Sequence, residues 1–394
     1  MEDSLTGMTN NTDIQPFRID IPQAAIDDLV RRLETTRWPA ASPVADWSRG
    51  TPRGYLQELA DYWRSRFDWR AQETRLNRFP QFTTTIDGQT IHFLHVRSPH
   101  ADARPLLITH GWPSSFVEYL RVLPLLTDPA AHGIEGPGFD VVIPSLPGYG
   151  FSRRPPRTGV NYRSTAALWR QLMRALGYQR YGAGGGDFGA GVASYIALDE
   201  PERVIGLHLT NLELAPYRGP GSRPLSEAER AYLAENQRWA DVERGYSSIQ
   251  STKPQTVGYG LNDSPAGLAA WILEKWRSWT DSKGDVETRF SREFLLTLLT
   301  IYWATQTITP SMRDYLDNRF HNPPIGPGER AHAPTALAVF DRMRAYEGTP
   351  PREWAERLFP DLRRYTVMPR GGHFAAAEEP ELVAQDIHAF FGGL

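Results

Sequence analysis

The chain has 394 residues, of which 40% are hydrophobic and 23% are charged, and its formal net charge is -3. This composition is typical of a globular protein and gives no general attraction to nucleic acid or to an anionic membrane. There is no cysteine, which excludes disulfides, thiolate nucleophiles and cysteine-ligated metals. The N-terminus is polar and acidic, and no apolar run of about 18 residues is present, so we expect a soluble cytoplasmic protein with no membrane span.

Two amphipathic helices are predicted before any strand. The first lies in DIPQAAIDDLVRRLETTRWP, where Leu29 and Leu33 recur at helical spacing, Asp20 is the expected N-cap and Pro22 suits the first turn. The second lies in TPRGYLQELADYWRSRFDW. Because no strand precedes them, these helices must pack onto later parts of the chain, and we expect them to wrap around it.

Short apolar runs then alternate with helix-like segments. FTTTIDGQTIHFLHVRS is predicted to be a hairpin with its turn at Asp87 and Gly88. RPLLITHGWP, FDVVIPSLPGYGFS, RYGAGGGDFGAG and VIGLHLTNLEL each resemble a buried strand that ends in a turn. A helical, aromatic-rich stretch follows, and strands return at Pro334–Phe340 and Arg363–Gly372. This alternation indicates a mostly parallel sheet that is covered on both faces.

The predicted fold class is therefore α/β, with a mostly parallel sheet flanked by helices, an inserted helical cap and an N-terminal wrapping segment. Ligands of open α/β sheets bind at the carboxyl ends of the strands, and the insertion is expected to cover that edge. The predicted divisions are 1–80 for the wrapping segment, 81–216 for the first part of the core, 217–328 for the cap and 329–394 for the second part of the core.

A glycine-rich stretch, YGAGGGDFGAGVASY, surrounds a single aspartate, Asp187. Gly184, Gly186 and Gly189 match the G-x-G-x-x-G template of dinucleotide binding. The charge of Asp187 would oppose a pyrophosphate at the helix N-terminus, however. The other interpretation is a nucleophile elbow, in which small residues on either side let a strand turn sharply into a helix and expose the aspartate. An ordinary aspartate in a glycine turn is the structural alternative.

An elbow nucleophile requires a base and an oxyanion hole. His373, in MPRGGHFAAAEEPE, follows the last predicted strand, where the base of such a fold is expected. The backbone N–H groups of Phe188 and Trp112, the latter in HGWP, are the candidate oxyanion donors. His110 of the same loop is interpreted as structural. No histidine and carboxylate cluster has ligand spacing, so neither a metal nor an organic cofactor is expected.

The motifs HGWPSSFVEY, SLPGYGFS, GGGDFG and RGGHFAAAEEPELVAQDI together resemble the microsomal-type epoxide hydrolases. FRIDIPQAAIDDLVRRLETTRWP resembles that family's N-terminal segment, and GYSSIQSTKPQTVGYGLNDSPAGLAAWILEKWRSWTD resembles its cap. The resemblance runs from about Phe17 to Phe391 and implies an α/β-hydrolase fold. Because the membrane anchor of the microsomal members is lacking, the chain resembles a soluble bacterial relative.

The resemblance also implies a mechanism. In this family an aspartate attacks an epoxide carbon to form an alkyl ester, which water activated by a histidine then hydrolyses to a diol. By motif the nucleophile is Asp187 and the general base is His373. Two cap tyrosines donate a proton to the departing epoxide oxygen, and by motif these are Tyr246 and Tyr315.

The carboxylate that would orient the histidine departs from the family pattern. The family places it at the third residue beyond the aromatic that ends its strand, and here that residue is Met343. Glu347 fits if positions are counted back from TPPREW, whereas Asp341 fits if they are counted forward from Phe340. We favour Glu347 and keep Asp341 as the alternative. An acid from elsewhere in the chain, or none, is the third option.

Two other functions remain open at this point. A haloalkane-type dehalogenase uses the same aspartate and histidine scaffold but needs halide donors in place of the tyrosine pair. A catalytically silent binding protein is the second alternative. The expected partner is a small-molecule epoxide, and the aromatic-rich cap favours a bulky or aromatic one. A role in bacterial secondary metabolism is compatible with this interpretation, and the sequence leaves the oligomeric state open, with a homodimer as one arrangement.

Overall fold

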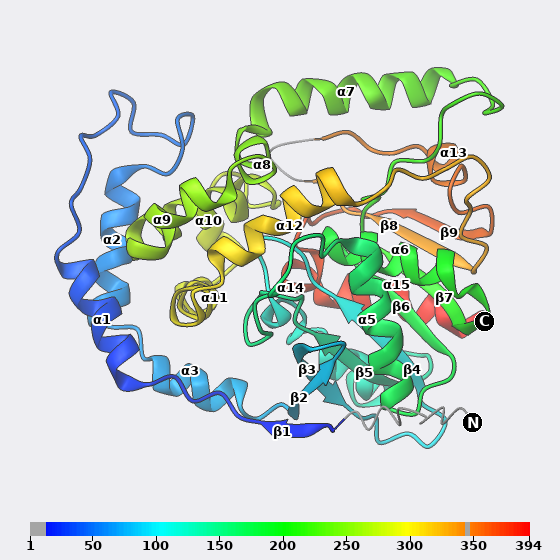
Figure 1. The fold of residues 1–394 in the computed structure, drawn as a ribbon, viewed down its shortest axis with the longest axis horizontal. Helices are drawn as coiled ribbons and strands as arrows, with labels where there is room; N and C mark the ends of the chain where they lie inside the picture. The colour runs from blue at the N-terminus through cyan, green and yellow to red at the C-terminus, as the bar shows by residue number, and fades with distance from the viewer. Residues whose placement is uncertain (1–12, 343–346) are drawn as a thin grey trace, which may run out of the picture.

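The computed structural model describes residues 13–342 and 347–394. In this part of the chain, nine strands form one sheet in the order β1-β2-β3-β5-β4-β6-β7-β8-β9 (Figure 1). Pairing is antiparallel from β1 through β3 to β5 and parallel from β5 through β4 to β9, which confirms the mostly parallel sheet. The strands are β1 Gln15–Phe17, β2 Gln81–Ile86, β3 Gln89–Val96, β4 Arg104–Thr109, β5 Phe139–Pro144, β6 Tyr181–Gly185, β7 Val204–Leu209, β8 Thr335–Val339 and β9 Leu362–Val367.

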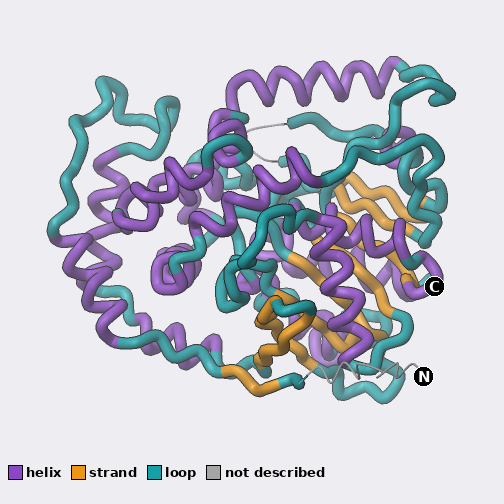
Figure 2. Tube along the Cα trace, viewed as in Figure 1, coloured by secondary structure: helices purple, strands orange, loops and turns teal. Residues whose placement is uncertain are grey.

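Helices flank the sheet and fill the predicted cap (Figure 2). α5 packs against α6, and α15 packs against α4 and the strands β7 and β8. Residues 210–334, all of which the structure describes, contain helices and no strand. The helices are α1 Gln23–Glu34, α2 Arg53–Ser65, α3 Trp69–Leu76, α4 Leu123–Thr127, α5 Tyr162–Ala175, α6 Phe188–Asp199, α7 Glu227–Glu243, α8 Gly245–Gln250, α9 Pro254–Asp263, α10 Pro265–Ser278, α11 Arg292–Thr305, α12 Ile308–His321, α13 Arg352–Ala355, α14 Ala375–Glu378 and α15 Pro380–Gly392.

The N-terminal helices pack onto the cap helices. Figure 1 shows α1 and α2 beside α9, α10 and α11. The indole N–H of Trp63, on α2, donates to the hydroxyl of Thr300 on α11 at 3.0 Å. Arg32, on α1, binds the carboxylate of Asp263 at the end of α9. The early helices therefore help to hold the cap. The prediction that they precede every strand is wrong, because β1 comes before α1 and pairs with β2 at the edge of the sheet.

The predicted cap of the first helix is wrong. α1 begins after Pro22, and no side chain caps its N-terminus. The backbone N–H of Ile21 instead donates to the carboxylate of Glu73, on α3, at 2.7 Å. This bond keeps the chain extended ahead of the helix and leaves Asp20 exposed to solvent, out of reach of the first-turn N–H groups.

The hairpin predicted at Asp87 and Gly88 is present. Ile86 pairs with Gln89, so the loop has two residues. Asp87 has a φ of 51° and Gly88 a φ of 77°. Positive φ at both central positions is what a two-residue turn of this hand requires, which explains why the aspartate–glycine pair is a strong local signal.

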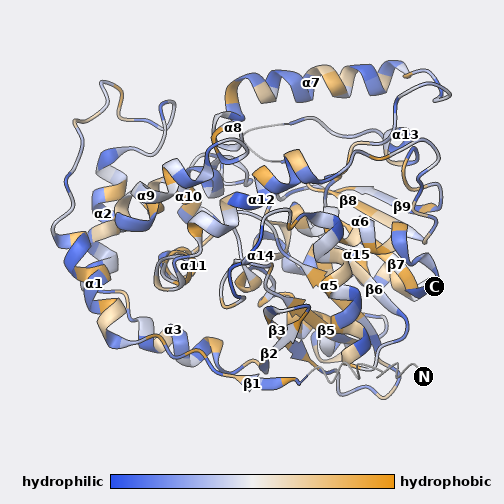
Figure 3. Ribbon diagram, in the orientation of Figure 1, coloured by the Kyte–Doolittle hydropathy of each residue, from blue (hydrophilic) through white to orange (hydrophobic). Residues whose placement is uncertain are grey.

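The long helix α7 lies at the periphery of the cap, and Figure 3 shows that it is largely hydrophilic. Glu229 is its one fully buried residue. The guanidinium of Arg357, which follows α13, donates to both carboxylate oxygens of Glu229 at 2.5 and 2.7 Å. This buried pair connects the start of the cap to the second part of the core.

We expect Glu229→Gln to lower the free energy of unfolding by about 3–5 kcal/mol, because it leaves the buried guanidinium of Arg357 without its counter-charge. The bonds from Arg357 hold the pKa of Glu229 at about 2, below its ordinary value. The stabilisation is therefore present at neutral pH and is lost as the pH falls toward 2, and only the wild type should show this loss. Urea unfolding at several pH values measures it.

The matched control is Asp361→Asn, because the pair of Asp361 with Arg363 is largely exposed. An exposed pair contributes at most about 1 kcal/mol. Equal losses in the two variants would show that the buried pair has no special part in fixing the cap.

Candidate active site

Asp187 stands between the end of β6 and the start of α6, with a φ of 51° and a ψ of -131°. This strained conformation depends on its small neighbours. A Cβ on Gly185 would lie 2.2 Å from the carbonyl oxygen of Thr109, and one on Gly189 would lie 1.9 Å from the same atom. The predicted sharp turn is present, and its glycines are required because β4 passes directly beneath it.

Two backbone amides hold one oxygen of the aspartate. The N–H of Phe188 donates to Oδ1 of Asp187 at 2.8 Å, and the N–H of Trp112 donates to the same oxygen at 2.9 Å. A Cβ on Gly111 would lie 2.3 Å from this oxygen, so the loop before Trp112 can approach only as glycine. The aspartate carboxylate thus occupies the helix N-terminus, where the dinucleotide interpretation would place a phosphate.

His373 faces the other oxygen of the carboxylate. Its Nε2 lies 3.2 Å from Oδ2 of Asp187, and its backbone N–H donates to the carbonyl of Trp279 in the cap at 2.7 Å. Burial alone would lower the pKa of His373, but the hydrogen bond and charge of Asp187, aided by Glu347 and Glu118, raise it to about 9. Before substrate binds, the two groups therefore form an ion pair at neutral pH.

The two cap tyrosines lie together above the aspartate. Tyr246 is on α8 and Tyr315 on α12, and their ring centroids are 5.8 Å apart. The ring of Tyr246 stacks on Trp112 with centroids 5.3 Å apart, and Tyr315 meets Phe188 edge to face at 4.8 Å. Burial, with the charge of Asp187, raises the pKa of both phenols well above its usual value, so both carry their protons.

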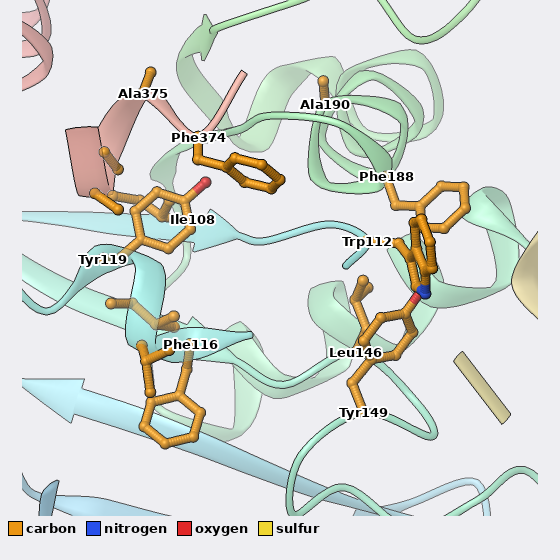
Figure 4. Packing of buried hydrophobic residues seen from close by; sticks show 14 of the residues in the cluster. Ile108, Trp112, Phe116, Tyr119, Leu146, Tyr149, Phe188, Ala190, Phe374 and Ala375 are labelled. Atoms are coloured by element: carbon orange, nitrogen blue, oxygen red, sulfur yellow. The ribbon is translucent and has the colours of Figure 1, made fainter. Parts of the chain in front are cut away.

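Asp187, Phe188, Tyr246, Tyr315 and His373 line one cavity of about 500 Å³. Phe188 is one of the lining residues, and Figure 4 shows its ring beside the ring of Trp112. The cavity wall combines aromatic and aliphatic side chains with polar groups. Apart from the residues described above, it includes Asn211, Leu212, Glu213, Leu214, Arg218, Tyr232, Trp239, Arg244, Val339, Phe340 and Trp354.

The two candidate acids differ in their surroundings. Burial raises the pKa of Glu347 and the charge of His373 lowers it, so these two groups are close enough to interact. The Oδ2 atom of Asp341 accepts a hydrogen bond from the hydroxyl of Thr349 at 2.5 Å. Among the described residues, neither carboxylate forms a hydrogen bond with His373. Met343, where the family places its acid, lies outside the described residues.

His110 lies beneath the site as a buried residue. Its Nε2 accepts a bond from the N–H of Leu146 at 3.3 Å, and its Nδ1 lies 3.1 Å from the carbonyl oxygen of Gly111. Burial lowers its pKa to about 4, so the ring is neutral. These contacts agree with the structural interpretation of this residue, since the ring fastens two loops together.

Three polar residues of the site are absent from the predicted set. The side-chain oxygen of Asn211 accepts the N–H of Asp187 at 2.7 Å. Glu213 accepts the hydroxyl of Tyr162 at 2.6 Å, and burial together with the charge of Asp187 raises its pKa to about 8. Glu118 is buried near enough to interact with the charges of His373 and Asp187, and burial raises its pKa to about 7. Asn211 and Glu213 follow β7 in LTNLEL, and their place at the carboxyl end of a strand is the signal that could have indicated them.

Within the described residues, no group of three or more histidine or acidic side chains has an arrangement that could hold a metal ion. Nor does any helix in the same part of the chain have the length and apolar character needed to cross a membrane.

The elbow, its two amide donors and a histidine after the last strands define an enzyme site of the α/β-hydrolase class. The family description "alpha/beta hydrolase fold" matches residues 104–294, and "Epoxide hydrolase N terminus" matches residues 14–119. A protein from Stigmatella aurantiaca assigned to the epoxide hydrolases is 45% identical over 96% of this chain and 84% of its own. Epoxide hydrolase 1 of Sus scrofa is 39% identical over 96% of this chain and 88% of its own.

Solved structures of epoxide hydrolases are also similar to this chain. The juvenile hormone epoxide hydrolase of Bombyx mori has a TM-score of 0.87 and 30% identity, over 97% of this chain and 95% of that one. The epoxide hydrolase of Aspergillus niger has a TM-score of 0.81 and 32% identity, over 96% of both chains. The chain belongs to the epoxide hydrolase family, as its motifs predict.

Proposed function

We propose that the chain converts an epoxide and water to a vicinal diol through an aspartyl alkyl ester on Asp187. The observation that carries this proposal is that the two carboxylate oxygens of Asp187 have different partners. Oδ1 accepts hydrogen bonds from two backbone amides, and Oδ2 faces His373. Oδ2 attacks an epoxide carbon from the side opposite the C–O bond. That bond breaks, and its oxygen takes a proton from Tyr246 or Tyr315, which yields a hydroxyalkyl ester.

The second half-reaction restores the enzyme. The proton held by His373 passes to the phenolate that ring opening leaves, so the phenol is restored and His373 becomes neutral. His373 then removes a proton from water, and the resulting hydroxide attacks the ester carbonyl carbon. Negative charge then develops on Oδ1, where the N–H groups of Trp112 and Phe188 stabilise it. The tetrahedral intermediate collapses as the bond from the carbonyl carbon to the alkyl-bearing oxygen breaks, and the protonated His373 gives its proton to that oxygen. The diol leaves with the oxygen that Asp187 first supplied, and the carboxylic acid left on Asp187 returns its proton to His373, which restores the initial pair.

We propose a bulky or aromatic epoxide as the substrate. A cavity of about 500 Å³ suits a small organic molecule, and Phe188, Trp239 and Trp279 are among the aromatic residues of its wall. A role in bacterial secondary metabolism stays a prediction. The measurement is kcat/KM across aryl and alkyl epoxides of equal heavy-atom number, with a preference for the aryl series expected. Halide release from haloalkanes without epoxide turnover would favour a dehalogenase instead.

A single-turnover reaction in ¹⁸O-water tests the ester mechanism. Excess enzyme reacts with an aryl epoxide, and mass spectrometry then measures the label in the diol and in the peptide that carries Asp187. We expect an unlabelled first diol and a labelled peptide, because water attacks the ester carbonyl carbon. A labelled first diol with an unlabelled peptide would mean that water attacks the epoxide directly.

Replacement of the two phenols should slow ring opening. We expect Tyr246→Phe and Tyr315→Phe each to reduce the rate of ester formation, and the double variant to lose a factor of about 10²–10⁴, because no acid then reaches the departing oxygen. Stopped-flow tryptophan fluorescence in single turnovers measures this rate. Tyr232→Phe is the control, since its phenol lines the same cavity and is not one of the two proposed donors, and it should stay near the wild-type rate. An equal loss of rate in Tyr232→Phe would mean that Tyr246 and Tyr315 have no special role in ring opening.

The orienting acid can be assigned by comparing two neutral substitutions. We expect Glu347→Gln to slow ester hydrolysis by a factor on the order of 100, because its charge acts on His373, and Asp341→Asn to have a smaller effect. The rate at which the ester disappears in single turnovers measures both. The opposite ranking would assign the role to Asp341, and no effect in either variant would mean that the acid comes from elsewhere, with Glu213 the next residue to test.

A further inference from the structure

A buried lysine lies against one of the proposed proton donors. Lys275, on α10, is 6% exposed. Its Nζ lies 4.7 Å from the ring centroid of Tyr246 and 5.7 Å from that of Trp279. The mechanism described above gives this residue no part, although an isolated ammonium group is costly to bury.

The ammonium group interacts with two carboxyl groups. It forms an ion pair with Glu274, whose other oxygen accepts the hydroxyl of Ser278 at 3.0 Å. Burial raises the pKa of Glu243 on α7, and the charge of Lys275 lowers it, so this carboxyl also lies near the lysine. Lys275 and Glu274 thus form a dipole whose positive end lies over the ring of Tyr246.

We propose that Lys275 is a positioning residue for epoxide ring opening, in which its ammonium group stabilises the negative charge that the Tyr246 ring acquires as the phenol gives up its proton. This inference rests on the proposed donor role of Tyr246. It goes beyond that role because it identifies the group that makes this phenol a stronger acid in the transition state.

The physical basis is a difference between two states of the ring. A neutral phenol attracts a cation only through its quadrupole, which gives a modest interaction. As the proton leaves, charge spreads from the oxygen into the ring, and the attraction to the ammonium grows. An interaction that strengthens in this way lowers the barrier, whereas one equal in both states would not. The indole of Trp112, stacked with centroids 5.3 Å apart, limits rotation of the ring away from this position.

The test separates the two half-reactions in three variants. We expect Lys275→Met to slow ester formation roughly tenfold and to leave the rate of ester hydrolysis unchanged. Lys275→Arg, which keeps a cation near the ring, should restore most of the loss. Glu274→Gln keeps the bond from Ser278 and removes only the counter-charge, so it should not slow ester formation. A purely structural ion pair predicts the opposite, namely that Lys275→Met and Glu274→Gln slow both steps alike.

The Tyr246→Phe background provides the second readout. Without the phenol there is no charge for Lys275 to stabilise, so adding Lys275→Met should have no further effect on ester formation. Equal effects of Lys275→Met in the two backgrounds would overturn the inference. If Lys275→Met does not fold, Glu274→Gln alone decides, since slower ester formation in that variant contradicts the inference.

Failure of the inference is distinguishable from failure of the proposed function. If the wild type forms no ester in ¹⁸O-water, the proposed function fails. If the wild type forms the ester and Tyr246→Phe slows it while Lys275→Met does not, only the role of Lys275 is wrong.

Discussion

Asp187→Asn is expected to abolish turnover and to leave no covalent intermediate. The amide retains an oxygen that can accept the N–H groups of Trp112 and Phe188, so the turn and the oxyanion donors can persist. What is lost is the carboxylate oxygen that would attack the epoxide carbon. Loss of a nucleophile lowers kcat by a factor on the order of 10⁴ or more. Steady-state diol formation and intact-protein mass after mixing with an aryl epoxide measure the two effects.

The matched control for this variant is Asp241→Asn. Asp241 is an exposed carboxylate on α7, far from the elbow in the sequence. It should show wild-type turnover and the wild-type transient adduct. Diol formation by Asp187→Asn at more than a few per cent of the wild-type rate would mean that Asp187 is not the nucleophile.

His373→Gln is expected to separate the two half-reactions. The Asp187 carboxylate remains able to open the epoxide, but no imidazole remains to activate the hydrolytic water. The ester should therefore accumulate to one equivalent, and intact-protein mass should increase by the mass of the epoxide. We expect kcat to fall by a factor of about 10²–10⁴, the usual contribution of a general base. Peptide mapping should place the adduct on Asp187.

His132→Gln is the control for this variant, because His132 is an exposed residue beyond α4. It should turn over normally and hold no stable adduct. If His373→Gln forms no adduct, the imidazole is required for ring opening, and the proposed division of labour is wrong.

The sequence predicts features that depend on neighbouring residues better than features that depend on contacts between distant segments. The hairpin at Asp87 and the elbow at Asp187 are set by turn residues within a few positions, so the pattern of glycines predicts both. The wrong prediction of an N-cap at Asp20 shows the limit of such local patterns, because a distant carboxylate, Glu73, holds that segment extended. Asn211 and Glu213 have only their place after β7 as a local signal, and Lys275 lies in a helix with no such signal, because its proposed role depends on the approach of Tyr246 from another helix.

The family resemblance does not identify a single carboxylate that would orient His373. It predicts positions where the motif is continuous, as at His373. Between Phe340 and TPPREW the chain is longer than the family pattern, so counting from either end gives a different carboxylate. Only the surroundings of Glu347 and Asp341 separate the two, and those surroundings depend on how the loop folds against the cap.

The ion pair between Asp187 and His373 has a consequence for the order of events. While the aspartate is charged, it keeps a proton on His373, whose pKa is about 9, so the imidazole cannot yet serve as a base. In the proposed reaction, ester formation turns this carboxylate into a neutral group. The strongest influence that holds the proton then disappears, and burial favours the neutral ring. Under this proposal, the first chemical step makes His373 available as the base of the second step.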